Sequence, residues 1–339
     1  MKTVYVGMSG GVDSSVSAAL LKDQGYHVVG VYMKNWSKNL PGMKCPWAED
    51  LADAKRVAVK LGIDFKVFDF ENEYKQKVVD YMLDEYKKGN TPNPDIMCNQ
   101  EIKFKLFAET AFEDGADFIA TGHYANVENG QLKKAKDENK DQTYFLYRVT
   151  TEALKKTIFP VGNMLKPEVK KLAEKYGLAN AHKPESMGVC FVGEANMKDF
   201  LSEFIDVKPG KIIEVETGKE LGYHDGAIFY TIGQRHGLNI GSGLPYYVAG
   251  KDMDKNIVYV SKNLNEKNLW TKEIELKDVF LREKAPAKID IRVRHRAPLI
   301  SAAFDGTTLH LETEIKRIAS GQSVVFYDGD VCLGGGIIA

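Results

Sequence analysis

The chain has 339 residues, of which 44% are hydrophobic and 27% are charged, and its formal net charge is −1. This length favours two or three domains, and the composition is that of an ordinary soluble globular protein. No run of about 18 apolar residues occurs, and the first residues lead straight into a predicted strand, so we expect neither a membrane span nor a signal peptide. With an overall charge near zero, any nucleic-acid binding has to depend on a local basic surface.

The first 120 or so residues alternate between strand-like and helix-like segments, which is typical of a parallel sheet with crossover helices. Strands are predicted at 3–6, 27–33, 64–70 and 117–120, and helices at 15–24, 47–61, 73–88 and 102–112. The polar segment 34–46 is too long for a simple connection, which indicates a mobile flap.

Farther along the chain the pattern changes. Asn129-Gly130 lies between short polar strands and predicts a hairpin, and a helix with Pro167 in its first turn is predicted at 166–176. After about residue 205 helical periodicity nearly vanishes, which predicts two small β-rich modules of the barrel type. We therefore expect an α/β catalytic domain at 1–204, a β-rich domain at 205–271 and a β-barrel at 272–339.

A glycine-rich loop follows the first predicted strand. Gly10 and Gly11 allow the backbone to turn tightly around an anion, and the next helix directs its positive end toward the same place. No G-K-[ST] follows, so this is not the common lysine-containing phosphate loop. It resembles the S-G-G-x-D-S pyrophosphate loop of ATP-dependent adenylating enzymes; the alternative is an ordinary turn. The predicted ATP-binding residues of the loop are Gly7, Met8, Ser9, Gly10, Gly11, Val12, Asp13 and Ser14. Asp13 is expected to hold a metal ion or to cap the helix.

A second motif ends in Cys98. Two prolines predict a stiff, exposed loop that delivers Cys98 to a helix N-terminus, where the helix dipole favours the nucleophilic thiolate. Asp95, three residues earlier, can cap the helix or move a proton. The alternative makes Cys98 a small buried hydrophobic residue and Asp95 a plain N-cap. The segment alone does not separate the two interpretations.

A third motif, at 184–194, contains Cys190. Taken alone, Cys190 lies in a short apolar run and is best interpreted as structural. The four cysteines are far apart and form no C-x-x-C pair, which argues against a zinc site or a secreted disulfide framework and favours a reducing cytoplasm. Cys98 and Cys190 can then act as a pair, one carrying sulfur as a persulfide while the other receives or releases it through a disulfide. Cys45 and Cys332 are interpreted as bystanders.

Over nearly its full length the chain resembles the bacterial tRNA-specific 2-thiouridylases, a family with the pyrophosphate (PP) loop and an adenine nucleotide alpha hydrolase-like domain. The motifs that carry the resemblance are GMSGGVDS at 7–14, NPDIMCN at 93–99, ATGHYA at 120–125, KDQTYFL at 140–146, GVCFVGE at 188–194, YTIGQR at 230–235 and YDGDVCLGGG at 327–336.

The resemblance implies ATP-dependent replacement of the C2 oxygen of the wobble uridine, position 34 of certain tRNAs, by sulfur. It adds Met33 and Gly122 to the ATP site and implies Mg²⁺ alongside ATP. Adenylation converts the C2 oxygen into a leaving group. Cys190 matches the persulfide position and Cys98 the other catalytic cysteine, so the two are expected to form a transient disulfide. Asp95 is expected to act as an acid or base.

The same resemblance implies contacts with the anticodon arm of Lys-, Glu- and Gln-type tRNAs. The flipped uridine would meet Asn93, Pro94 and Asp95. The other implied tRNA contacts are His123, Lys140, Asp141, Gln142, Arg294, His295 and Gln322. A cysteine desulfurase or a sulfur-relay protein is the expected sulfur donor.

A basic cluster at 292–296 adds evidence from the residues themselves. On a strand, alternation places Arg292, Arg294 and Arg296 on one face as a row for phosphates, although a solvated strand face is an equal alternative. Two positions depart from the family pattern: Met187 replaces a small hydroxyl residue, and His295 replaces a tyrosine, which weakens the case for stacking on a base there.

Two other functions have to be compared with thiolation. A PP-loop ligase or amidotransferase acting on a small molecule would need no cysteine pair and no basic barrel. A non-catalytic RNA-binding protein with a relic nucleotide loop would not need Asp13, Cys98 and Cys190 together.

Overall fold

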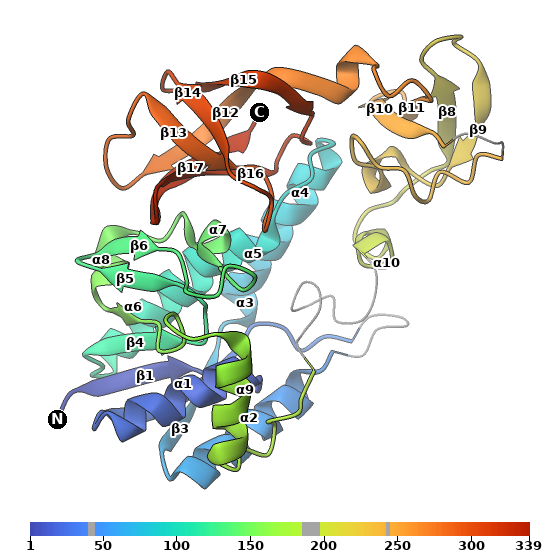
Figure 1. Ribbon diagram of the computed structural model, residues 1–339. Helices are drawn as coiled ribbons and strands as arrows, with labels where there is room; N and C mark the ends of the chain where they lie inside the picture. The colour runs from blue at the N-terminus through green and yellow to red at the C-terminus, as the bar shows by residue number, and fades with distance from the viewer. Residues whose placement is uncertain (40–44, 185–196, 242–244) are drawn as a thin grey trace.

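The computed structural model describes residues 1–39, 45–184, 197–241 and 245–339. The α/β region, which contains the N-terminus, lies at the bottom of Figure 1, with a closed barrel above it and a smaller β-rich module to the side. The predicted fold class is therefore confirmed. Among the described residues, no helix is long and apolar enough to cross a membrane.

The N-terminal sheet has five parallel strands in the order β3-β2-β1-β4-β7. Its strands are β1 (Thr3–Gly7), β2 (His27–Lys34), β3 (Asp64–Asp69), β4 (Phe118–Thr121) and β7 (Thr157–Ile158). The central strand β1 is buried on both faces because its side chains enter two separate cores, Val4 and Val6 in one and Tyr5 in the other. Strands buried on both faces are expected in a parallel sheet covered by helices.

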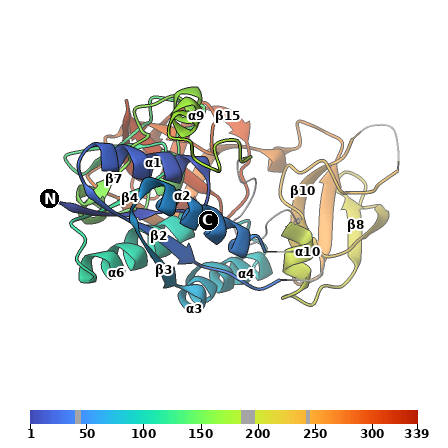
Figure 2. The same ribbon diagram turned by 90° about the horizontal axis from the view of Figure 1, so that it is seen from below.

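Helices cover both faces of this sheet (Figure 2). On one face lie α1 (Val12–Asp23), α2 (Trp47–Leu61) and α9 (Lys166–Lys175), which share a core with Val4 and Val6. On the other face two longer helices are each assembled from three consecutive segments. They are α3 (Glu71–Tyr74), η1 (Lys75–Asp80) and α4 (Tyr81–Lys87), and then α5 (Pro94–Met97), η2 (Cys98–Leu106) and α6 (Phe107–Glu113).

Two of the predicted helices begin in the wrong place. α1 starts at Val12, three residues before the predicted start, because Gly11 is its N-cap. The helix predicted at 102–112 begins at Pro94, since Asn93 caps it with its side chain and Pro94 suits the first turn. Both η1 and η2 are π-helical, a wider winding that is frequent at functional sites.

The predicted hairpin is present as β5 (Asn126–Glu128) and β6 (Gln131–Lys133), with positive φ at Asn129 and Gly130. Its partner was not predicted. Leu132 of β6 pairs with Cys332 of β17 (Val331–Ile338), so the hairpin adds two strands to the C-terminal sheet. The short helices α7 (Thr143–Leu146) and α8 (Thr151–Lys155) follow the hairpin.

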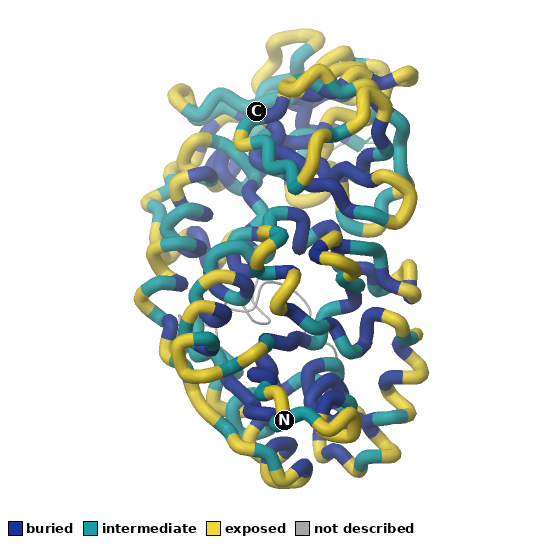
Figure 3. Tube along the Cα trace, turned by 90° about the vertical axis from the view of Figure 1, so that its left-hand side faces the viewer, coloured by how far each residue is buried: buried dark blue, intermediate teal, exposed yellow. Residues whose placement is uncertain are grey.

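The C-terminal region is a barrel of six antiparallel strands in the order β12-β15-β14-β13-β16-β17, closed by pairing of β12 with β17. The remaining strands of the barrel are β12 (Trp270–Leu281), β13 (Lys288–Arg292), β14 (Ile300–Phe304), β15 (Thr308–Lys316) and β16 (Ser323–Asp328). β17 approaches β12 closely because Gly334 has no side chain, and a Cβ there would overlap the Phe280 carbonyl. Figure 3 shows that the trace is buried inside the barrel and inside the parallel sheet, and exposed along the outer loops.

The smaller module contains a four-stranded sheet in the order β10-β11-β8-β9, preceded by α10 (Met197–Ser202). Its elements are β8 (Gly210–Glu214), β9 (Glu220–His224), η3 (Ala227–Phe229), β10 (Tyr247–Asp252), β11 (Ile257–Ser261) and η4 (Lys267–Leu269). It has its own core around Val248, Val258 and Val260.

Candidate active site

The glycine-rich loop connects the end of β1 to α1. Gly10 has a φ of 77°, a left-handed conformation that favours glycine, and Gly11 caps the helix in an extended conformation. Asp13 and Ser14 therefore lie in the first turn of α1, and the prediction that Asp13 caps the helix is wrong. The loop hydroxyls are close together, with 3.4 Å between the Ser9 and Ser14 oxygens. A helix N-terminus with this loop before it is suited to bind phosphate.

The structure brings together the three segments predicted to form the ATP site. A Cβ at Gly7 would lie 2.9 Å from Cε of Met33, and a Cβ at Gly122 would lie 2.5 Å from the Ser14 backbone nitrogen. A Cβ at Gly10 would overlap the backbone of Asp50 in α2. The loop is thus held between β2, the segment after β4 and α2, so it is preformed by close backbone packing.

Sequence reasoning missed Lys166, which contacts the loop from the start of α9. Its Nζ lies 2.6 and 2.8 Å from the two carboxylate oxygens of Asp13. Tyr124 donates its hydroxyl to the same carboxylate at 3.0 Å. Lys166 is only 7% exposed, whereas the Asp13 side chain is 30% exposed, so the carboxylate side of the ion pair remains open to solvent. The sequence showed only a lysine before a helix-initiating proline, and no local signal indicated its partner.

Asn180 was missed as well. Its Nδ2 donates to the Gly10 carbonyl at 2.8 Å and to the Ser15 hydroxyl at 2.9 Å. The residue is 4% exposed, and its Oδ1 has no hydrogen-bond partner. The buried Asn180 side chain therefore fixes the carbonyl of Gly10, the loop residue with the left-handed conformation, relative to the first turn of α1.

Cys98 lies one turn inside the helix that begins at Pro94, and it is 4% exposed. The prediction of an exposed loop that delivers Cys98 to a helix N-terminus is therefore wrong in this structure. Pro92 and Pro94 are themselves buried. The capping residue is Asn93, whose Oδ1 accepts from the Asp95 and Ile96 backbone N–H groups at 3.1 and 3.4 Å, so Asp95 is not the N-cap.

Asp95 and His123 both lie in the electrostatic field of Lys103 in η2. Burial raises the pKa of the Asp95 carboxyl, and the Lys103 charge partly opposes that rise. Burial lowers the pKa of His123 well below its usual value, and Lys103 lowers it further. An acid with a raised pKa is suited to proton transfer, which is the role predicted for Asp95. Lys103 was not predicted as a site residue.

The segment 120–124 joins the glycine-rich loop to the helix that carries Cys98. Gly122 abuts the first turn of α1, and the next residue, His123, packs on Phe104 of η2 with ring centroids 5.7 Å apart. The His123 Nδ1 also lies 2.8 Å from the Thr121 hydroxyl, which orients the ring. Two neighbouring residues thus contact the two halves of the predicted site.

Several predicted tRNA contacts are engaged within the protein. Asp141 is 2% exposed and its Oδ2 accepts from Arg292 Nη1 at 3.0 Å. The Gln142 side chain accepts from the Tyr124 backbone N–H at 2.8 Å. His295 packs on Phe145 with centroids 4.6 Å apart, and burial is the main reason that its pKa is lowered. In this conformation the Asp141 side chain cannot contact RNA.

The predicted arginine row is also incorrect. β13 ends at Arg292, and the next four residues form a bend and turn in which Arg296 has a φ of 63°. Strand alternation therefore does not apply to Arg294 and Arg296. Arg292 faces Asp141 and the Tyr327 ring, whereas Arg294 and Arg296 are exposed at the turn.

The other cysteine predictions have mixed outcomes. Cys190 and the departure at Met187 lie outside the described residues. Cys332 is 1% exposed beneath α7, and burial raises the pKa of its thiol, as expected of a bystander. Cys45 is half-buried, with its Sγ 3.5 Å from the Trp36 carbonyl.

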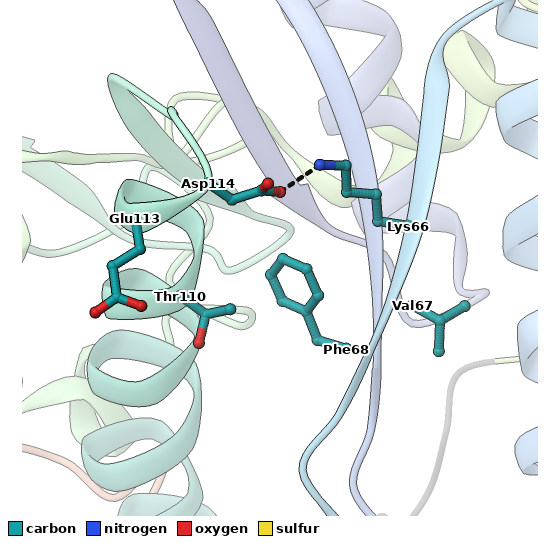
Figure 4. A pocket seen from close by; sticks show the side chains of 6 residues that line it. All are labelled: Lys66, Val67, Phe68, Thr110, Glu113 and Asp114. Carbon is teal, nitrogen blue, oxygen red and sulfur yellow. Dashed lines mark hydrogen bonds and ion pairs between the residues drawn. The ribbon is translucent and has the colours of Figure 1, made fainter.

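A surface cavity of about 580 Å³ lies elsewhere, between β3 and α6. Lys66 and Asp114 form an ion pair across it, and Phe68 points into it (Figure 4). None of the predicted site residues lines this cavity. It therefore gives no support for a second substrate site.

A parallel sheet whose first strand leads into a phosphate-binding loop, followed by two β-rich modules, defines a PP-loop nucleotide-binding protein with appended barrels. Three family models match the chain in order. They are described as tRNA methyl transferase HUP domain (residues 2–194), tRNA methyl transferase PRC-barrel domain (residues 198–262) and aminomethyltransferase beta-barrel domain (residues 267–338).

Curated relatives specify the family further. The chain is 46% identical to the tRNA-specific 2-thiouridylase MnmA of Lactococcus lactis subsp. lactis, covering 99% of this chain and 94% of the relative. It is 48% identical to that of Lacticaseibacillus paracasei, covering 99% and 93%. The chain belongs to the tRNA-specific 2-thiouridylase (MnmA) family.

Similarity to solved structures is weaker. A 4-thiouridine synthetase in complex with RNA and ATP is 18% identical, with a TM-score of 0.39, over 60% of this chain and 50% of the other. The relation to the family therefore rests on the sequence relatives and on the site.

Proposed function

We propose that this protein is a tRNA-uridine 2-sulfurtransferase that makes 2-thiouridine at the wobble position with ATP as the activating substrate. The observation that carries the proposal is the contact of adjacent residues with both halves of the site. Gly122 packs against the glycine-rich loop at the start of α1, and His123 packs on Phe104 in the helix that carries Cys98. The loop and the helix that carries the Cys98 thiol are thus linked through two consecutive residues.

The first step uses the glycine-rich loop. The uridine C2 oxygen attacks the α-phosphate of ATP, and pyrophosphate leaves. Lys166 and the N-terminus of α1 supply positive charge where negative charge develops on the phosphates. The oxygen donors of Asp13, Ser9 and Ser14 suit Mg²⁺, which would neutralise phosphate charge there. Met33 at the end of β2 borders the same site.

The second step transfers sulfur. The terminal sulfur of a persulfide on Cys190 attacks C2, and AMP leaves with the former C2 oxygen. The Cys98 thiolate then attacks the Cys190 sulfur, which releases 2-thiouridine and leaves a Cys98–Cys190 disulfide. A thiol reductant returns both cysteines to thiols. Asp95, whose pKa burial raises, accepts or returns the proton during these exchanges.

The tRNA is bound by the anticodon arm, and its wobble base leaves the stack to reach Asn93, Pro94 and Asp95. The exposed Arg294 and Arg296 would contact backbone phosphates. Lys-, Glu- and Gln-type tRNAs are the proposed substrates, and a cysteine desulfurase or relay protein supplies the sulfur. The chain would consist of domains at 1–204, 205–271 and 272–339. The first would catalyse the reaction, and the last would bind the RNA.

The test is thiolation of unmodified tRNA with ATP, cysteine and a purified cysteine desulfurase, followed by mass spectrometry of the digested tRNA. Cys98→Ser and Cys190→Ser should each abolish 2-thiouridine, because each removes a sulfur that the balanced steps require. Cys332→Ser is the matched control, since that thiol is buried against α7 and should keep activity.

Full activity in either of the first two variants would remove that cysteine from the mechanism. AMP formation that does not need tRNA would instead support a ligase acting on a small molecule.

A further inference from the structure

Thr91, just before the Asn93–Asp95 segment that starts α5, is a point where all three regions of the molecule meet. Its backbone N–H donates to the Ser320 carbonyl of the barrel at 2.8 Å. Its own carbonyl accepts from Gln322 Nε2 at 2.6 Å. Its hydroxyl lies 3.2 Å from the hydroxyl of Thr231 in the smaller module. Both backbone groups and the side chain of Thr91 are therefore held by other domains.

The barrel side of this junction is a tight turn at residues 319–322. Gly321 has a φ of 88°, and a Cβ there would lie 2.9 Å from Asn90 Cβ and 3.0 Å from the Thr91 backbone nitrogen. The turn is tied to the end of β17, since the Ile338 N–H donates to the Gln322 carbonyl at 2.8 Å. The turn is thus rigidly mounted on the barrel and in direct contact with Thr91.

The chain between Thr91 and the catalytic helix is stiff. Pro92 and Pro94 fix φ at two of the three positions that follow Thr91. Asn93 between them caps the helix through the Asp95 and Ile96 N–H groups. A displacement of Thr91 is therefore transmitted to Asp95 and to the helix that carries Cys98, rather than absorbed by a flexible linker.

We propose that Gln322 is a positioning residue for the reaction: it fixes the Asn93–Asp95 segment through the Thr91 carbonyl, and this function does not depend on contact with tRNA. This inference rests on the proposed function, and it changes the role that family resemblance implies for Gln322. The barrel would then contribute to the chemical step as well as to RNA binding.

Gln322→Met tests the proposal because it keeps the length of the side chain and removes the donor. At saturating tRNA the single-turnover rate of thiolation should fall about tenfold, since a small displacement of reacting groups is costly. The dissociation constant for tRNA should change by less than about twofold. Gln322→Lys, which restores a nitrogen donor, should recover part of the rate.

Hydrogen exchange provides a second test, which requires neither tRNA nor thiolation activity. Hydrogen exchange of the Asp95 and Ile96 amides in the free protein should be faster in Gln322→Met, because the cap they donate to is displaced. Gly321→Ala should have the same effect from the other side of the contact. Gln131→Met is the control: Gln131 also bridges the N-terminal region and the barrel, through Glu283 at 3.3 Å, but far from Thr91.

Unchanged exchange at Asp95 and Ile96 in both variants would overturn the proposal. So would weaker tRNA binding with an unchanged rate at saturation, which is the result expected of a simple RNA contact. If the wild-type protein makes no 2-thiouridine, the proposed function fails, while the exchange measurement still decides whether Gln322 holds the Asn93–Asp95 segment.

Discussion

The glycine-rich loop and the Asn93–Cys98 segment differ in which parts of the molecule support them. The loop is supported within the α/β region, by Met33, Gly122, Lys166 and Asn180. The Asn93–Cys98 segment packs in the α/β core through Ile96 and Cys98, and it has a further anchor outside that region, through Thr91, in the barrel and the smaller module. Under the proposed function, activation of the substrate should therefore depend on one domain, and positioning of the Cys98 thiol on contacts with all three.

Because of this difference, substitutions in the two regions should impair different steps of the reaction. Changes near α1 and α9 should impair the use of ATP and leave the other domains in place. Changes at the junction should leave ATP binding intact and impair sulfur transfer. The following predictions test this separation, starting with the largest expected effect.

Lys166→Met should lower AMP formation about 10² to 10³-fold, because it removes a preorganised positive charge at the phosphates and leaves Asp13 uncompensated. The measurement is single-turnover AMP release with saturating ATP and tRNA. Lys170→Met is the matched control, since Lys170 is exposed on the same helix. AMP formation at the wild-type rate would show that the ion pair is structural only.

Arg282→Met should weaken the contact between the barrel and the α/β region. The Arg282 guanidinium donates to the carbonyls of Leu146, Tyr147, Val149 and Cys332, at 2.7 to 3.1 Å. Loss of these charge-assisted bonds should lower the free energy of unfolding by about 2 to 4 kcal/mol in urea. ATP affinity of the folded protein should be unchanged, while thiolation falls.

The control for that change is Arg317→Met, an exposed arginine of the barrel that donates to the Asn268 carbonyl outside the interface. An equal loss of stability in both variants would contradict a special role of Arg282 at the interface.

Lys251→Met should have the smallest effect, and it should depend on pH. Burial lowers the pKa of Lys251 to about 8, although its Nζ donates to the Tyr230 carbonyl at 2.8 Å. Because the unfolded lysine titrates near 10.4, the unfolded state binds more protons between about pH 8 and 10, so the stability of the wild-type protein rises with pH across that window. Below pH 8 the cost of burying the charge is present in full.

The methionine variant should therefore be more stable than wild type by about 1 to 2 kcal/mol at pH 7, with a difference that shrinks toward pH 10. Urea unfolding at several pH values measures it. Lys255→Met, which changes an exposed lysine of the same module, should show no such trend. A difference that is constant with pH would mean that the change acts through packing.

The sequence predicted those features that depend on local pattern. The strand, glycine turn and helix at 3–23 could be predicted because each requires particular residues at particular positions. The places of Met33 and Gly122 at the ATP site were implied by the family resemblance. The contact of Lys166 with Asp13 could not be predicted, because a lysine 153 positions away carries no mark of its partner.

The errors have different origins. Arg292, Arg294 and Arg296 alternate in sequence as a strand would, but the positive φ of Arg296 turns the chain. Cys98 follows two prolines, as in an exposed loop, yet it lies inside a helix and packs in the hydrophobic core of the α/β region. The first error comes from a local turn that strand-like alternation does not reveal, and the second from tertiary packing that local propensity does not show.

The pairing of β6 with β17 gives the molecule an order of assembly. Leu132 pairs with Cys332, and Thr91 is held by a turn that is itself tied to Ile338. The barrel residues that make these contacts are synthesised well after Thr91 and Leu132, so these two anchors form only after the barrel strands have been made. A nascent chain that includes only the α/β region would already contain the nucleotide loop with Lys166 and Asn180. It would still lack the barrel contacts that anchor the Asn93–Cys98 segment through Thr91.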